Sequence, residues 1–177
     1  MAGQGTPRKR RACCPAKPKQ NKTGAMARRV IDLADEAQTA RLAARIAAAA
    51  RTRDTIALSG PLGSGKTSFA RAFIRSLGNG DEDVPSPTFT LVQTYEFPGR
   101  PTVWHFDLYR LEAADEIYEL GIEEAWADGI CLIEWPERIA ALLPRDRLDI
   151  ALAAGEQPQQ RRATVTGPAR WDAVLDG

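Results

Sequence analysis

The chain has 177 residues, of which 44% are hydrophobic, and its 24 basic and 23 acidic residues leave a formal net charge of +1 at pH 7. This length suits one domain of ordinary size with a tail. The sequence contains no run of 18 apolar residues, so we expect no membrane-spanning helix. Three cysteines and one histidine offer no set of zinc ligands, and this cysteine usage is typical of a reduced, cytoplasmic protein.

Charge is distributed unevenly along the chain. Residues 1–25 contain seven basic residues and no acidic one, which leaves 17 basic and 23 acidic residues, a net charge of −6, in residues 26–177. The N-terminal segment has no apolar periodicity, which predicts a basic, disordered extension before one domain over residues 26–177. Its charge would allow salt-sensitive binding to RNA. No aromatic residues alternate with the basic ones, however, so we favour a solvated tail.

Apolar patterning predicts alternating strands and helices. In chain order, the expected elements are a strand at 28–33, a helix at 35–50, a strand at 54–59, a helix at 66–77, strands at 89–97 and 102–109, a helix at 112–128 with a break at Gly121, strands at 129–137, 147–154 and 161–167, and a helix at 169–175. Asp35 is placed to cap the first helix, and Gly78 to end the second. This alternation predicts a three-layer α/β fold, in which a mostly parallel sheet has helices on both faces. The strands around the turn at 98–101 predict an added antiparallel hairpin.

Residues 60–67 match the phosphate-binding pattern G-x-x-x-x-G-K-[ST], with an expected strand before the motif and an expected helix after it. Glycines let consecutive backbone amides point inward and form a concave anion site, and the dipole of the following helix favours negative charge there. Lys66 would bind the β- and γ-phosphates, and the Thr67 hydroxyl would bind Mg²⁺. The motif predicts a P-loop NTPase-like fold that binds a nucleoside triphosphate.

Adenine is the expected base. Guanine-specific P-loop proteins usually carry an N-K-x-D segment after the loop. In this chain the Asn-Lys pair lies upstream, at residues 21–22, and Gly24 stands in place of the aspartate. ATP is therefore the expected nucleotide.

Two acidic residues lie where a P-loop enzyme needs a carboxylate to hold Mg²⁺ and orient the attacking water. Glu134 follows four apolar residues at the carboxyl end of an expected strand, where α/β sheets place ligand groups. Asp107 ends the apolar alternation of another strand. We predict a functional role for both, with a solvent-facing strand end as the alternative. His105 and Trp135 are expected to be structural, since no serine or cysteine partner can be identified for the histidine.

A polar, proline-rich stretch at 78–88 is long for a connection, and such loops are usually functional or mobile. Its end, residues 86–89, could close over the γ-phosphate as a nucleotide-sensing switch. A plain connection is an equal alternative.

Several motifs occur together in the order and approximate spacing of one family. They are LSGPLGSGKTSFAR at 58–71, SPTFTLV at 86–92, HFDLYRL at 105–111, ELG at 119–121 and ICLIEWPE at 130–137. By these motifs the chain resembles the bacterial TsaE (YjeE) family, the small ATPase of tRNA threonylcarbamoyladenosine synthesis. The resemblance extends from about Val30 to Val165, and residues 1–25 have no counterpart.

The resemblance implies a P-loop fold and binding of ATP with Mg²⁺, with hydrolysis that is weak in the isolated protein. The implied partners are the TsaB–TsaD pair, in which TsaD carries the transfer chemistry, so tRNA is reached indirectly through that complex. The residues implied to surround the nucleotide are Gly63, Ser64, Gly65, Lys66, Thr67 and Ser68, with Glu36 also close to it. Those implied at the Mg²⁺ are Thr67, Glu134 and Asp107. The implied catalytic residues are Lys66, Asp107 and Glu134. Ser68 stands where many relatives have a second threonine, which keeps the hydroxyl.

A P-loop small-molecule kinase is the alternative function. Such a kinase would need an acceptor pocket and an arginine-rich lid over the phosphates. Arg110, Arg138 and Arg145 lie in the appropriate part of the chain, but they occur singly among acidic residues. We therefore favour an ATPase that drives or resets a partner complex.

Overall fold

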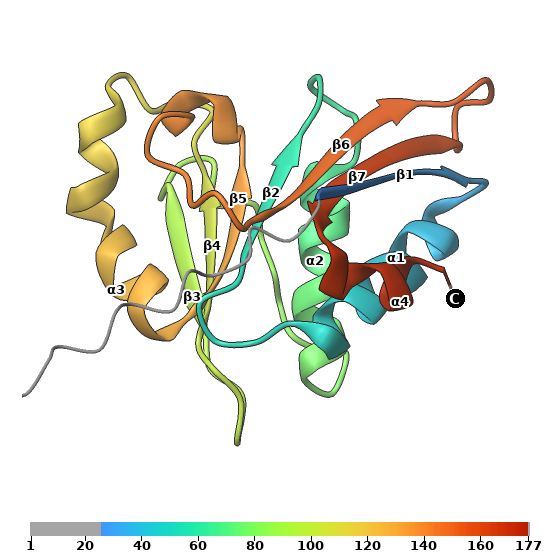
Figure 1. The fold of residues 1–177 in the computed structure, drawn as a ribbon. Coiled ribbons are helices and arrows are strands. Elements are labelled where there is room, and N and C mark those ends of the chain that lie inside the picture. The colour runs from blue at the N-terminus through green and yellow to red at the C-terminus, as the bar shows by residue number, and fades with distance from the viewer. Residues whose placement is uncertain (1–25, 177) are drawn as a thin grey trace, which may run out of the picture.

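One seven-stranded sheet organises residues 26–176, which are the residues that the computed structural model describes (Figure 1). Its strands are β1 (Met26–Leu33), β2 (Thr55–Ser59), β3 (Val92–Tyr95), β4 (Val103–Asp107), β5 (Ile130–Glu134), β6 (Leu148–Ala154) and β7 (Arg161–Pro168). The α-helices are α1 (Glu36–Ala49), α2 (Lys66–Leu77), α3 (Ile122–Asp128) and α4 (Asp172–Leu175), and short 3₁₀ helices are η1 (Ala114–Leu120), η2 (Pro136–Ile139) and η3 (Ala169–Trp171). The predicted extension over residues 1–25 lies outside the described residues.

The sheet has the order β1-β7-β6-β2-β5-β4-β3, and its four central strands, β6, β2, β5 and β4, are parallel. The antiparallel pair β3–β4 confirms the predicted hairpin. A second antiparallel section, β6–β7–β1, lies at the other side of the sheet. Residues 155–160 alone join β6 to β7, which is too short for the crossover that parallel strands require. The predicted α/β fold is confirmed, with a sheet that is mixed at both ends.

Several predicted elements differ in extent from their sequence pattern. The strand expected at 129–137 ends at Glu134, because Trp135 adopts a left-handed φ of 58° and η2 follows it. The helix expected at 169–175 consists of η3 and the four-residue α4. The strand expected at 89–97 begins only at Val92, because Leu91 adopts a left-handed φ of 64° and its amide donates to the Pro87 carbonyl at 2.6 Å. The helix expected at 112–128 is divided into η1 and α3 at Gly121, whose φ is 79°. Glycine tolerates this conformation without steric cost, and the break predicted at Gly121 is therefore present.

The first helix forms as its sequence pattern predicts. Asp35 accepts a hydrogen bond from the Gln38 amide at 2.7 Å and caps α1. Leu42 and Ile46, one turn apart on α1, are buried against the sheet. No helix among the described residues combines the length and the apolar character that crossing a bilayer requires.

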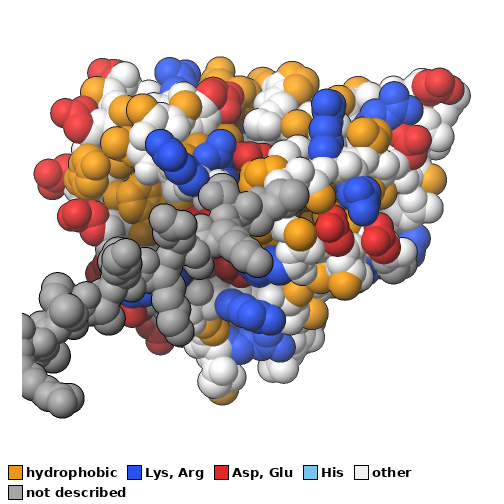
Figure 2. Space-filling model, viewed as in Figure 1, with side chains coloured by type: hydrophobic (Ala, Val, Ile, Leu, Met, Phe, Trp, Pro, Cys, Tyr) orange, Lys and Arg blue, Asp and Glu red, His pale blue; other side chains and the backbone are white. Residues whose placement is uncertain are grey.

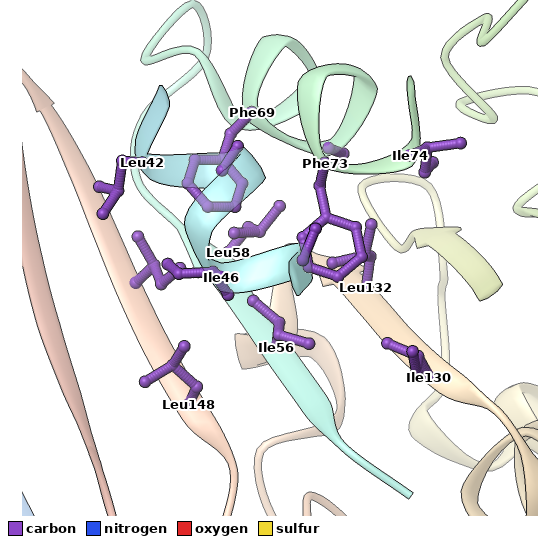
Figure 3. Close-up of a cluster of buried hydrophobic side chains, with 14 of the residues drawn as sticks. Leu42, Ile46, Ile56, Leu58, Phe69, Phe73, Ile74, Ile130, Leu132 and Leu148 are labelled. Atoms are coloured by element: carbon purple, nitrogen blue, oxygen red, sulfur yellow. The ribbon is translucent and has the colours of Figure 1, made fainter. Parts of the chain in front are cut away.

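Helices cover both faces of the sheet, with α1, α2 and α4 on one side and α3 on the other (Figure 1). Figure 3 shows Phe69 and Phe73 projecting from α2 toward Leu58 of β2 and Leu132 of β5. A second apolar cluster, which includes Ile133, lies on the α3 face. All five residues of β5 are buried, including Glu134 at its carboxyl end.

Candidate functional site

The predicted phosphate loop connects β2 to α2 at the carboxyl edge of the parallel strands. Gly60 has a φ of 134°, and a Cβ atom at this position would lie 2.2 Å from the carbonyl oxygen of Leu152. Gly65 has a φ of 99° and forms the N-cap of α2. Both positions require glycine, one for close approach of β6 and the other for backbone conformation. The first-turn amides of α2, which lack intrahelical partners, therefore face the loop.

Lys66 is 4% exposed and its ammonium group is held by the loop itself. Nζ donates to the carbonyl oxygens of Gly60 at 2.8 Å and Pro61 at 3.0 Å. It also lies 3.8 Å from the ring centroid of Trp135, a cation–π contact. Burial lowers the pKa of Lys66, while the negative charges of Glu134, Glu137 and Asp107 act in the opposite direction. A phosphate group would supply stronger acceptors than these carbonyls.

Glu134 is 1% exposed at the end of β5, and both of its carboxylate oxygens have partners. Oε2 accepts a hydrogen bond from the Thr67 hydroxyl at 2.9 Å, and Oε1 lies 2.9 Å from Nε2 of His105. His105 is fully buried on β4, and its Nδ1 has no hydrogen-bond partner among the described residues. The His105 ring therefore orients the Glu134 carboxylate, which gives a specific content to the structural role predicted for this histidine.

Asp107 lies beside Glu134 in the parallel register of β4 and β5. Its Oδ2 accepts hydrogen bonds from Thr88 Oγ1 at 2.6 Å and from Ser86 Oγ at 3.3 Å. Its Oδ1 accepts one from the Tyr109 amide at 3.1 Å. Residues 86–89, considered above as a nucleotide-sensing loop, are therefore attached to the predicted catalytic aspartate.

These groups border one cleft with a volume of about 390 Å³. Its lining consists of Leu62, Gly63, Gly65, Lys66, Thr67, Ser68, Ser86, Thr88, Asp107, Tyr109, Glu134, Trp135 and Arg161. Most residues predicted for the site thus meet in one place. Ser64 is buried beside the cleft without lining it, and its hydroxyl has no hydrogen-bond partner among the described residues.

Glu36 borders a smaller neighbouring cavity of about 180 Å³. The two spaces share Gly65, Ser68 and Arg161 in their linings, so the smaller cavity adjoins the phosphate loop. Sequence patterns did not indicate Arg161, which lies at the start of β7, far from every motif along the chain. Tyr109 was also missed, although it lies within HFDLYRL and packs against Trp135 with ring centroids 4.9 Å apart.

The donors in the cleft are compatible with Mg²⁺, which prefers oxygen ligands and usually retains water and phosphate oxygens in its coordination shell. Thr67 and Glu134 present a hydroxyl and a carboxylate side by side. No group of three or more His, Cys, Asp or Glu side chains suited to a metal occurs within residues 26–176. A metal ion here would need additional ligands from a bound phosphate and from water, which fits Mg²⁺ better than a metal held entirely by protein.

The chain is similar to one family of known proteins in sequence, and to a solved structure in fold. The family model described as "Threonylcarbamoyl adenosine biosynthesis protein TsaE" matches residues 33–163. A tRNA threonylcarbamoyladenosine biosynthesis protein TsaE from Rickettsia felis is 38% identical over 142 residues, which cover 80% of this chain and 82% of the relative. The protein of the same name from Bacillus subtilis is 38% identical over 132 residues, covering 73% and 81%. The crystal structure of Bacillus subtilis YdiB has a TM-score of 0.67 at 27% identity and covers 87% of this chain and 95% of its own.

Proposed function

The chain belongs to the TsaE family of tRNA threonylcarbamoyladenosine biosynthesis, and we propose that it is the Mg²⁺-dependent ATPase subunit that drives or resets the TsaB–TsaD complex. The observation that carries this proposal is the arrangement of Lys66, Thr67 and Glu134 around the mouth of one glycine-rich loop. A lysine, a hydroxyl and a carboxylate at a helix N-terminus are the groups that phosphoryl-transfer sites use. A cytoplasmic location is part of the proposal.

Nucleotide binding begins with the phosphate loop. The anion site at the N-terminus of α2 would hold the β- and γ-phosphates, and the Lys66 ammonium would exchange the carbonyls of Gly60 and Pro61 for phosphate oxygens. Glu36 lines the adjoining cavity, which shares Gly65, Ser68 and Arg161 with the cleft, and the proposal assigns the rest of the nucleotide to this cavity. Mg²⁺, when bound near Thr67 and Glu134, neutralises phosphate charge.

The proposal gives the two carboxylates, Glu134 and Asp107, different roles. Glu134 is fixed by Thr67 and His105, which suits a group that must keep one orientation beside the phosphates. Asp107 is more adaptable, because its partners Ser86 and Thr88 lie on a loop. Movement of these hydroxyls toward the γ-phosphate would free the Asp107 carboxylate to orient a water molecule. This coupling makes residues 86–89 responsive to the nucleotide.

Exposed apolar side chains near the cleft support dependence on a protein partner. Leu62, in the phosphate loop, is 79% exposed, and Phe89, in the 86–89 segment, is 80% exposed. Tyr109 is also exposed and lines the cleft. A partner that covers these groups would bury apolar area and exclude water from the reacting phosphates. The proposal therefore expects weak turnover by the protein alone and faster turnover in the complex.

Surface charge favours indirect contact with tRNA. Along one edge of Figure 2, acidic side chains gather over η1 and α3, whose exposed carboxylates belong to Asp115, Glu116, Glu119, Glu123, Glu124 and Asp128. Residues 111–137 contain no lysine or arginine. Such a surface repels a polyanion. The proposal therefore assigns tRNA binding to the partner complex rather than to this face.

The test combines calorimetric titration of the full chain with ATP and Mg²⁺ and a phosphate-release assay. We expect ATP binding, slow release of phosphate by the protein alone, and a clear rise when the cognate TsaB–TsaD pair and tRNA are added. Absence of binding heat would reject the nucleotide role. Binding without a rise in turnover, or phosphoryl transfer to a nucleoside or sugar in a parallel screen, would reject the partner role and favour the kinase.

A further inference from the structure

Arg161 holds the phosphate loop from the side of β7. Its Nε donates to the carbonyl oxygen of Ser64 at 3.1 Å, and its second terminal nitrogen lies 3.5 Å from the carbonyl of Gly63. The other terminal nitrogen donates to the carbonyls of Pro158 at 2.7 Å and Gln160 at 2.8 Å. The guanidinium group thus joins the β6–β7 connection to the loop, across 97 positions of the sequence.

This contact determines how one peptide group of the loop is oriented. In a trans peptide the carbonyl and the amide that follows it point in opposite directions. A Ser64 carbonyl held by Arg161 therefore directs the Gly65 amide away from the guanidinium. Gly65 is the N-cap of α2 and its carbonyl accepts from the Phe69 amide at 2.9 Å, so the next peptide is fixed by the helix. Together these bonds hold two successive peptides of the anion site.

The charge of Arg161 is not neutralised by any carboxylate of the described residues within ion-pair distance, and its guanidinium lines both the cleft and the smaller cavity. The neighbouring Arg162 differs, because it pairs with Asp32 at 2.6 Å. An unpaired cation at this position attracts a bound polyanion. Arginine suits the contact better than lysine, because its planar fork donates several hydrogen bonds in fixed directions.

We propose that Arg161 is a positioning residue for the nucleotide phosphates, which orients the Ser64–Gly65 peptide toward the bound anion. The inference rests on the proposed nucleotide function and adds to it a residue outside the phosphate-loop motif. A residue that merely stabilised the fold would affect all ligands alike. A residue that arranges the loop affects ligands according to the number of phosphates they carry.

The experiment compares Arg161→Gln, Arg161→Lys and the matched control Arg162→Gln in the full chain. Calorimetry with Mg²⁺ measures the affinities for ATP, ADP and AMP. We expect Arg161→Gln to weaken ATP binding by about ten- to a hundredfold, the range for loss of a charge-assisted hydrogen bond, and to weaken AMP binding much less. Arg161→Lys, which keeps the charge but not the fork, should recover only a small part of the loss. Arg162→Gln should bind all three nucleotides like the unsubstituted chain.

Several outcomes would overturn the inference while leaving the proposed function intact. They are equal affinities in Arg161→Gln and Arg162→Gln, equal losses for ATP and AMP, and full recovery in Arg161→Lys. Hydrogen exchange in the unsubstituted protein provides a measurement that needs no variant, since ATP binding should slow exchange at the Gly65 amide, and unchanged exchange would contradict the role. Failure of the unsubstituted chain to bind ATP would instead reject the proposed function itself.

Discussion

Thr67 donates its hydroxyl to the Glu134 carboxylate at 2.9 Å, and this bond connects the first turn of α2 to the end of β5 across 67 positions of sequence. The second carboxylate oxygen lies 2.9 Å from His105 of β4. Three elements that are remote in the sequence therefore fix one buried acidic group. The roles of the phosphate loop and of the Glu134 carboxylate can therefore be tested separately, by replacing one residue at a time.

Replacing Lys66 with alanine should remove most of the affinity for ATP, by about a hundredfold or more, because a charge-assisted contact to phosphate is lost in a buried setting. Calorimetric titration with ATP and Mg²⁺ measures the effect. Arg100→Ala, which removes an exposed basic residue from the turn before β4, is the matched control and should bind normally. Equal affinities in the two variants would contradict the assignment of Lys66.

Replacing Glu134 with glutamine should reduce turnover more than binding. The variant keeps the size of the side chain but loses the charge beside Thr67, so ATP affinity should fall by less than about tenfold and phosphate release by about a hundredfold. Both are measured in the presence of the partner proteins. Glu96→Gln, an exposed change directly after β3, should leave both unchanged. The division of roles fails if binding and turnover decline to the same extent.

Local sequence patterns predict the central part of the molecule well, because each signal is confined to a few neighbouring residues. The glycines of the phosphate loop, the helix from Lys66 and the acid after the apolar run of β5 were all found this way. Asp107 and Glu134 also lie side by side, as strand ends in a parallel sheet should.

Local sequence patterns could not predict the long-range contacts of the site. Arg161 reaches Ser64 only because β7 lies beside β6, and β6 lies beside β2, an order that depends on the packing of the whole sheet. The contact of Lys66 with the ring of Trp135 likewise depends on the left-handed backbone of Trp135, with a φ of 58°. Periodicity predicts which elements form, whereas the sheet order decides which side chains meet.

His105→Leu should lower phosphate release more than ATP affinity, because the Glu134 carboxylate loses a donor that orients it. His105→Gln restores a side-chain N–H close to the position of Nε2 and should recover part of the rate. Phosphate release and ATP titration are measured for both variants alongside thermal unfolding, so that loss of stability is separated from loss of turnover. If glutamine and leucine slow turnover equally, the ring acts through packing and not through the hydrogen bond.

Phe73→Ala should destabilise the fold by about 3–5 kcal/mol, the usual cost of deleting a buried aromatic side chain. Phe73 is fully buried between α2 and the sheet. Phe89→Ala is the matched control, because Phe89 is mostly exposed and its ring lies 4.3 Å from the Arg110 guanidinium at the surface. Urea unfolding of both variants measures the difference. A loss below about 1 kcal/mol for Phe73→Ala would contradict the packing.

Cys131 should resist alkylation in the folded protein at pH 8 and react readily in urea. Burial raises the pKa of its thiol to about 12, against a smaller opposing effect of the neighbouring Thr55 side chain. Because the unfolded chain releases this proton near pH 8.5 and the folded chain does not, the free energy of unfolding should fall as the pH rises from about 9 toward 12. Peptide mass spectrometry distinguishes Cys131 from Cys13 and Cys14 after labelling. In urea titrations, raising the pH from 8 to 10 should lower the stability of Cys131→Ala less than that of the unsubstituted chain. Equal losses of stability in the two proteins, or rapid labelling of folded Cys131, would show that the thiol ionises in the folded protein.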